Sequence, residues 1–191
     1  LHELSKARGG ALSRFVTRSA GGELKFAWKS AEAMRMLTEV LLERDFGVEV
    51  KCHPGRLCPP LPNRLNYLYW LDDLLEHWSV EEQRAHVLDV GVGSNAIYPI
   101  LGNKQFGWRF TGSDIDGESL EWARNHVISK ESEEDISLIK TDECTTAQEI
   151  FSSGDSDSSA ELFLSLQKYI LGESSRETCR GPIRKARSGM G

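Results

Sequence analysis

Residues 86–96 read HVLDVGVGSNA, and this stretch decides the fold. A short apolar strand over 87–90 is expected to run into the turn Gly91-Val92-Gly93, and a helix is expected to follow as far as Leu101. Glycines at a strand-to-helix turn let backbone N–H groups approach a ligand at the positive end of the helix, where a Cβ would stand in the way. The stretch predicts a nucleotide-type binding site, although a tight turn without a ligand has the same pattern.

The alternation of strand and helix continues downstream of this turn. Residues 108–113 form a second apolar run, which Asp114 closes. A helix is predicted over 118–130 with Asp116 as its N-cap, and residues 136–140 give a third strand. The order β-α-β-α-β over 86–151 is typical of half of a doubly wound parallel sheet.

An N-terminal module over 23–85 is predicted to be mainly helical. Ser30 can cap a first amphipathic helix, and Gly47 supplies its stop. A short strand is expected over 48–51.

The proline-rich run over 57–62 separates the two helices of this module. Because proline lacks a backbone donor, the run is predicted to be a rigid connector that continues neither helix nor central strand. Asn63 then caps a second amphipathic helix, which is predicted to end at about Trp78.

The two ends of the chain are basic, although the formal net charge of the whole chain is -6. Residues 1–29 carry six Lys and Arg against two Glu, and residues 176–191 carry five against one. We expect a disordered basic lead-in over 1–22. Over 152–191 we expect a Ser/Asp linker, one helix over 160–171 and a disordered basic tail. Basic ends can pair with the phosphates of nucleic acids, but a solvated tail is an equally good interpretation.

Cysteine and histidine usage predicts neither a metal site nor a disulfide framework. The four cysteines form no C-x-x-C pair, and the histidines do not flank them at zinc-ligand spacing. No apolar run approaches the roughly 18 residues that a membrane span needs. We therefore expect no membrane association and an intracellular, reducing compartment, either nucleus or cytoplasm. The cysteines are Cys52, Cys58, Cys144 and Cys179.

Two acids near the glycine turn bear on which cofactor it would hold. Gly91, Gly93 and Ala96 fit the G-x-G-x-x-A form of the dinucleotide fingerprint, with Asp114 at the expected distance of about 20 residues, so an NAD-dependent oxidoreductase stays open. Asp89 favours S-adenosylmethionine, since its carboxylate would attract the ammonium of that cofactor and repel a pyrophosphate. Asp114 would then bind the ribose hydroxyls.

Three separated blocks of sequence resemble one family. They are LCPPLPNR over 57–64 followed by Asn66-Tyr67, LDVGVGSNAIYP over 88–99, and GWRFTGSD over 107–114. The family is that of the bacterial large-subunit ribosomal RNA adenine-N(6) methyltransferases and their eukaryotic relatives, which modify U6 small nuclear RNA. The resemblance covers roughly residues 23–138. It implies an α/β, Rossmann-like class I methyltransferase fold, S-adenosylmethionine as cofactor and structured RNA as partner.

The resemblance also implies roles for particular residues. Arg64 matches an arginine that contacts the cofactor, for whose carboxylate a planar fork of donors is suited. Gly91 and Asp114 match the cofactor-binding glycine and the ribose-binding acid, and Gly93 belongs to the same turn. Thr145 matches a position near the adenine ring of the cofactor, and the basic lead-in corresponds to an RNA-contacting module.

One departure from the family concerns the transfer itself. In the family a fourth strand ends in Asn-Pro-Pro-Phe, whose polar groups accept the hydrogens of the target amine while the aromatic ring stacks on the extruded base. This chain contains no such run, so we predict no catalytic residue and an incomplete sheet of three strands with an open edge. A truncated or mis-spliced product, foreign to the family beyond Phe151, is the favoured explanation, and an RNA- or cofactor-binding pseudoenzyme is the alternative.

Overall fold

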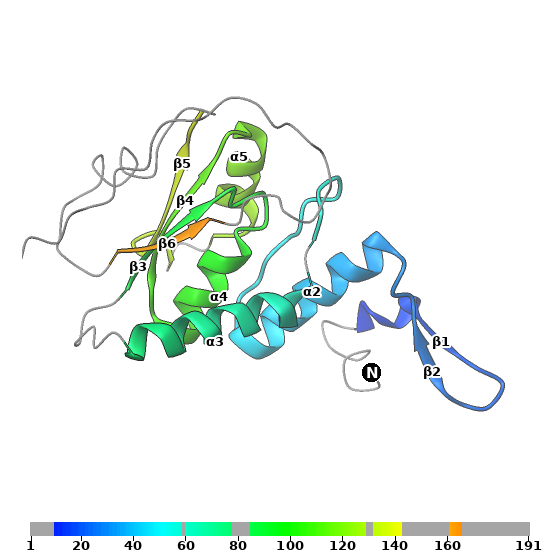
Figure 1. The fold of residues 1–191 in the computed structure, drawn as a ribbon. Coiled ribbons are helices and arrows are strands. Elements are labelled where there is room, and N and C mark those ends of the chain that lie inside the picture. The colour runs from blue at the N-terminus through cyan, green and yellow to red at the C-terminus, as the bar shows by residue number, and fades with distance from the viewer. Residues whose placement is uncertain (1–9, 59, 78–84, 129–131, 143–160, 166–191) are drawn as a thin grey trace, which may run out of the picture.

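A four-stranded parallel sheet organises the chain in the computed structural model, which describes residues 10–58, 60–77, 85–128, 132–142 and 161–165. The strand order across the sheet is β5-β4-β3-β6 (Figure 1). The strands are β3 (His86–Val90), β4 (Arg109–Asp114), β5 (Ile136–Lys140) and β6 (Glu161–Ser165). The β-α-β-α-β order predicted from the sequence is confirmed, and β5 has the predicted bounds.

Two helices connect the first three strands of this sheet. Helix α4 (Ile97–Phe106) joins β3 to β4, and α5 (Gly117–His126) joins β4 to β5. Right-handed crossovers that step in one direction place both helices on the same face, as Figure 1 shows. Because β6 lies on the other side of β3, the order of connection reverses there. Ligands of doubly wound sheets bind beyond the carboxyl ends of the strands at such a switch point.

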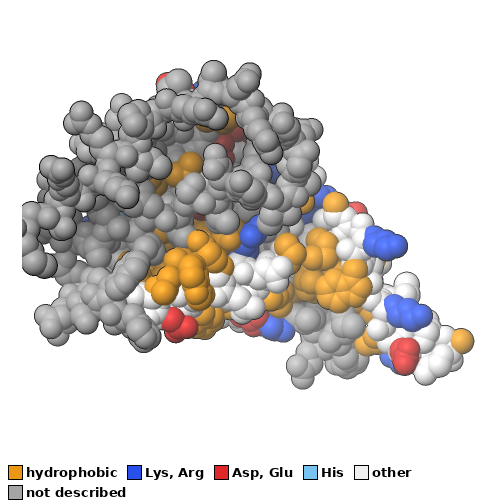
Figure 2. Space-filling view, viewed as in Figure 1, with side chains coloured by type: hydrophobic (Ala, Val, Ile, Leu, Met, Phe, Trp, Pro, Cys, Tyr) orange, Lys and Arg blue, Asp and Glu red, His pale blue; other side chains and the backbone are white. Residues whose placement is uncertain are grey.

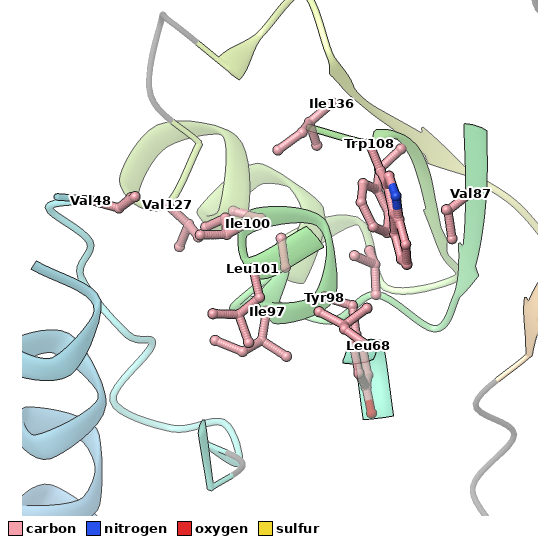
Figure 3. Packing of buried hydrophobic residues seen from close by; sticks show 14 of the residues in the cluster. Val48, Leu68, Val87, Ile97, Tyr98, Ile100, Leu101, Trp108, Val127 and Ile136 are labelled. Atoms are coloured by element: carbon pink, nitrogen blue, oxygen red, sulfur yellow. The ribbon is translucent and has the colours of Figure 1, made fainter. Parts of the chain in front are cut away.

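The main hydrophobic core surrounds α4 and joins it to the sheet, to α3 (Leu61–His77) and to α5 (Figure 3). Ile97, Ile100 and Leu101 of α4 are buried there together with Trp108 and Phe110. Helix α4 is buried along its first six residues, from Ile97 to Gly102, which is why its sequence is apolar rather than amphipathic. The packed core fixes the end of β3 and the start of α4, between which the glycine turn lies.

The N-terminal module contains the two predicted helices. Helix α2 (Ala31–Phe46) begins as expected, because Ser30 Oγ accepts a hydrogen bond from the Ala33 N–H at 3.2 Å, and it ends at Gly47 in the left-handed conformation. The predicted strand over 48–51 is wrong. These residues form no strand, although the Lys51 N–H donates to the carbonyl of His126 at 2.9 Å.

The second helix, α3 (Leu61–His77), begins three residues before residue 64, the first helical position expected from a cap at Asn63. The predicted Asn63 cap is therefore wrong, because Asn63 lies inside the first turn of the helix. Pro62 therefore belongs to its first turn rather than to the connector. Proline is tolerated at that place because the first N–H groups of a helix have no intrahelical acceptor.

The expectation of a disordered lead-in is wrong for residues 10–22. A short 3₁₀ helix, η1 (Ser13–Phe15), leads into a hairpin of β1 (Val16–Arg18) and β2 (Leu24–Phe26), with Val16 opposite Phe26. Leu12 and Phe26 bury their side chains in a second small core against α2. The Gly- and Arg-rich composition hides these few apolar positions, whose packing partners Ala33 and Val40 lie in the next element of the sequence, α2.

The predicted helix over 160–171 is also wrong where the structure describes it. Residues 161–165 form β6, whose backbone pairs with β3 from His86 opposite Glu161 to Val90 opposite Ser165. The expected sheet of three strands is wrong as well, because β6 pairs with β3 as a fourth strand. Residues 143–160, with most of the predicted linker, and the predicted tail lie outside the described residues.

Two further expectations concern membranes and metals. No helix in the described part of the chain is long and apolar enough to cross a membrane. Within the same ranges no three His, Cys, Asp or Glu side chains are grouped so as to hold a metal ion. Cys52 and Cys58 are free thiols whose sulfur atoms lie 3.7 Å apart, while Cys144 and Cys179 are outside the described residues.

Candidate cofactor site

The glycine turn follows β3 at the switch point of the sheet. Gly91 and Gly93 have φ values of 79° and 66°, in the left-handed region that side chains rarely adopt. The N–H groups of Gly91 and Val92 both donate to the carbonyl of Ser113 at 2.8 and 3.0 Å. A Cβ on either glycine would meet no atom within 4 Å, so the backbone conformation, not crowding, requires glycine in this turn.

Asp114 braces the turn from the carboxyl end of β4. Its Oδ2 accepts the Gly93 N–H at 2.8 Å, and its Oδ1 accepts the Asp116 N–H at 2.9 Å. Asp116 in turn caps α5 as predicted, accepting from the Glu118 N–H at 3.1 Å. Because a carboxylate offers about four acceptor positions, Asp114 keeps capacity for two more donors, such as a pair of hydroxyls.

Asp89 is the penultimate residue of β3 and is only 2% exposed. The pKa of its carboxyl is raised to about 7, chiefly by burial and also by the negative charge of Asp114, while the positive charge of Arg64 acts in the opposite direction. A buried carboxylate of this kind is costly until a cation is placed beside it. A ligand cation that binds next to the glycine turn would therefore stabilise the carboxylate of Asp89.

Arg64 lies in the first turns of α3 and brings the opposite charge to the same region. Its Nη1 donates to the Tyr98 hydroxyl at 3.1 Å, and its guanidinium carbon lies 5.5 Å from the centroid of that ring. Its Nε is buried and has no hydrogen-bond partner among the described residues. The arginine is held, but part of its donor fork is still available.

Three more polar side-chain atoms around the turn resemble Arg64 Nε in being buried without a hydrogen-bond partner among the described residues. Ser94 Oγ, Asn95 Oδ1 and Ser113 Oγ are buried and lack a hydrogen-bond partner within the described ranges. Unpaired buried polar groups are rare and call for an explanation, and a polar ligand at the turn would supply one. None of these three residues was predicted from the sequence as a site residue, although the polar pair Ser94-Asn95 inside an otherwise apolar stretch was a visible signal.

The predicted site residues are thus brought together, with one exception. Arg64 and Asp114 are each close enough to Asp89 for their charges to act on its carboxyl, and Gly91 and Gly93 form the turn that Asp114 braces. Thr145 lies outside the described residues, so its predicted place near an adenine ring stays a prediction.

The strand order, the glycine turn at the switch point and the acid after the next strand define a Rossmann-like domain with a nucleotide-type cofactor site. The RNA methyltransferase family matches residues 4–159, and the chain belongs to this family. The expected α/β methyltransferase fold is confirmed by a crystal structure, the N-terminal domain of human METTL16 in complex with SAH. That structure is 29% identical, with a TM-score of 0.68, and the match covers 75% of this chain and 55% of the other.

Curated relatives agree with the family. The chain is 39% identical over 126 residues to Ribosomal RNA large subunit methyltransferase F of Photobacterium profundum, covering 63% of this chain and 37% of the relative. It is 37% identical over 123 residues to the U6 small nuclear RNA (adenine-(43)-N(6))-methyltransferase of Dictyostelium discoideum, covering 60% of this chain and 22% of that protein. The chain therefore spans well under half the length of these relatives.

Proposed function

We propose that this chain binds S-adenosylmethionine and forms the cofactor-binding half of an RNA adenine-N(6) methyltransferase. The observation that carries the proposal is that the buried carboxyl of Asp89 and the guanidinium of Arg64 both lie beside the glycine turn. The amino-acid end of S-adenosylmethionine carries one ammonium and one carboxylate, so it needs one anionic and one cationic partner. These two residues supply that pair.

Each part of the cofactor finds a partner of suitable chemistry. Asp89 would take the ammonium, the open donors of Arg64 the carboxylate, and Asp114 the ribose hydroxyls. When bound, the cofactor supplies a methyl group on a positive sulfonium. A dinucleotide fits less well, because its pyrophosphate would lie near the carboxylates of Asp89 and Asp114, and like charges repel strongly at low dielectric.

The proposed substrate class is adenine in structured RNA. Both curated relatives are named for RNA, and one of them for adenine N(6). The hairpin end of this chain exposes the basic residues Arg14, Arg18, Lys25 and Lys29, and Figure 2 shows basic side chains at that end of the molecule. Phosphate contacts by such residues dominate the affinity of nucleic-acid binding.

We further propose that the 191-residue chain does not itself transfer the methyl group. Strand β6 lies beside β3, as the fourth strand of the sheet, but the sequence after Ser165 reads Leu166-Gln167-Lys168-Tyr169 instead of Asn-Pro-Pro-Phe. Without that motif nothing identified in this chain accepts the hydrogens of the amine or stacks on the base. Cofactor binding and transfer are then separable properties.

Calorimetric titration tests the first part of the proposal. S-adenosylhomocysteine should bind to the purified chain with one-site behaviour, whereas NAD at the same concentration should give no binding heat. Binding of NAD without S-adenosylhomocysteine would instead support a small oxidoreductase and refute the proposal. A radiolabelled methyl assay on structured RNA tests the second part, and clear incorporation by this chain would refute it.

A further inference from the structure

A hydrogen bond joins two sequence blocks that are separated by 34 residues. Arg64 belongs to the Arg64-x-x-Tyr67 block on α3, and Tyr98 belongs to the Ile97-Tyr98-Pro99 block on α4. The Tyr98 side chain is 5% exposed, and the Tyr67 ring packs edge-on against it at a centroid distance of 5.7 Å. The tyrosine is therefore fixed from two sides.

The hydrogen bond to Tyr98 affects how the opposite charges of Arg64 and Asp89 can interact. Arg64 is near enough to Asp89 to lower the pKa of its carboxyl, and in a poorly solvated setting such opposite charges attract strongly. Yet these two described residues form no ion pair. Arg64 instead donates to the phenol of Tyr98, and burial raises the pKa of that phenol, which keeps it neutral.

A direct pair between Arg64 and Asp89 would mask both charges. The carboxylate would no longer be free for an ammonium, and the guanidinium would lose donors needed for a carboxylate. A ligand could then bind only after breaking a buried ion pair, which is costly. Holding the two charges apart keeps both available.

We propose that Tyr98 is a positioning residue that keeps Arg64 apart from Asp89, so that the two charges can receive the amino-acid end of the cofactor. The inference rests on the proposed function, since it assumes that S-adenosylmethionine occupies this site. Tyr98 acts through its hydroxyl, which accepts from Arg64, and through its ring, over which the cation lies. Tyr67 supports the ring and has no direct part.

The test uses Tyr98→Phe and two probes that differ only at the amino-acid end. S-adenosylhomocysteine carries the ammonium and the carboxylate, whereas 5′-methylthioadenosine keeps the adenosine and the sulfur and lacks both charges. Loss of one hydrogen bond to a charged group should weaken S-adenosylhomocysteine about tenfold. The affinity of 5′-methylthioadenosine should change by less than about twofold, because neither Arg64 nor Asp89 contacts it in this account.

Tyr69→Phe is the matched control. Tyr69 lies on α3, the helix that carries Arg64, is 43% exposed and packs against Phe106 rather than at the site. Its loss of a phenol hydroxyl should change the affinity of neither probe. Thermal unfolding of both variants shows whether either substitution disturbs the fold.

A second measurement separates positioning from mere packing. In Tyr98→Phe the released arginine moves toward Asp89 and lowers the pKa of that carboxyl. The pH at which the unfolding free energy levels off should therefore move below 7, a shift that a purely structural role would not produce.

The outcomes distinguish this inference from the function on which it rests. If wild type binds S-adenosylhomocysteine and Tyr98→Phe weakens both probes equally, or neither, the positioning role is overturned while the cofactor site stands. If wild type binds neither probe, the proposed function fails and the inference fails with it. Selective weakening of S-adenosylhomocysteine together with the pH shift supports both.

Discussion

Replacing Asp89 by Asn should remove a loss of stability that the free wild-type protein undergoes as the pH becomes alkaline. The pKa of Asp89 is raised from 3.8 to about 7 in the folded state, chiefly by burial. Between these two values the folded state binds a proton that the unfolded state has released. The corresponding stability is fully present below the unfolded pKa and is lost as the pH rises through the folded pKa.

The magnitude follows from the width of this window. From about pH 5 to pH 7 the folded carboxyl keeps a proton that the unfolded carboxyl has released, so the free energy of unfolding falls by ~1.4 kcal/mol per pH unit. Wild type should therefore lose about 3 kcal/mol through this group by about pH 8.5. An asparagine does not titrate and loses nothing. Relative to wild type, Asp89→Asn should therefore gain about 3 kcal/mol between the two pH values, whatever its offset near pH 5.

Urea unfolding of both proteins at the two pH values measures this difference. Contributions from the groups that the two proteins share cancel in the comparison. The same variant should bind S-adenosylhomocysteine at least about tenfold more weakly, because it has no charge for the ammonium. If the free energies of unfolding of variant and wild type differ by the same amount at both pH values, burial does not destabilise the charged form of Asp89. That result would refute the prediction.

Three further substitutions separate stability from binding. Gly102→Ala should destabilise by about 2 kcal/mol in thermal unfolding, because the new Cβ would collide with the Phe110 ring, and an unchanged melting temperature would show that the core yields there. Ser30→Ala should cost about 1 kcal/mol through loss of the α2 cap while cofactor affinity stays the same, so a change in affinity measured by calorimetry would contradict this account. Asp114→Asn should lower S-adenosylhomocysteine affinity about tenfold, because an amide has one acceptor oxygen where two backbone N–H groups now donate to the two oxygens of the carboxylate. A variant with wild-type affinity would contradict the role of Asp114 in bracing the turn.

Local chemistry made the middle of the chain predictable. The glycine turn, the Asp116 cap and the Ser30 cap each depend on a few neighbouring residues, and all three are as the sequence indicated. The acids Asp89 and Asp114 were found because a strand end fixes where a side chain emerges.

Long-range partners made the rest unpredictable. Residues 161–165 read equally well as helix, and the edge of β3 that they pair with is distant in the sequence. The hairpin at 16–26 depends on burial against α2 in the same way. Tyr98 was part of a recognised block, but its role is visible only once α3 places Arg64 beside it.

Hydrogen exchange of the chain with and without S-adenosylhomocysteine addresses the location of the cofactor most directly. Bound ligand should slow exchange of backbone amides in residues 91–96 and 114–116, where the glycine turn and Asp114 lie, and leave the hairpin at 16–26 unchanged. Binding without protection of the glycine turn, or with protection confined to the hairpin, would contradict the account.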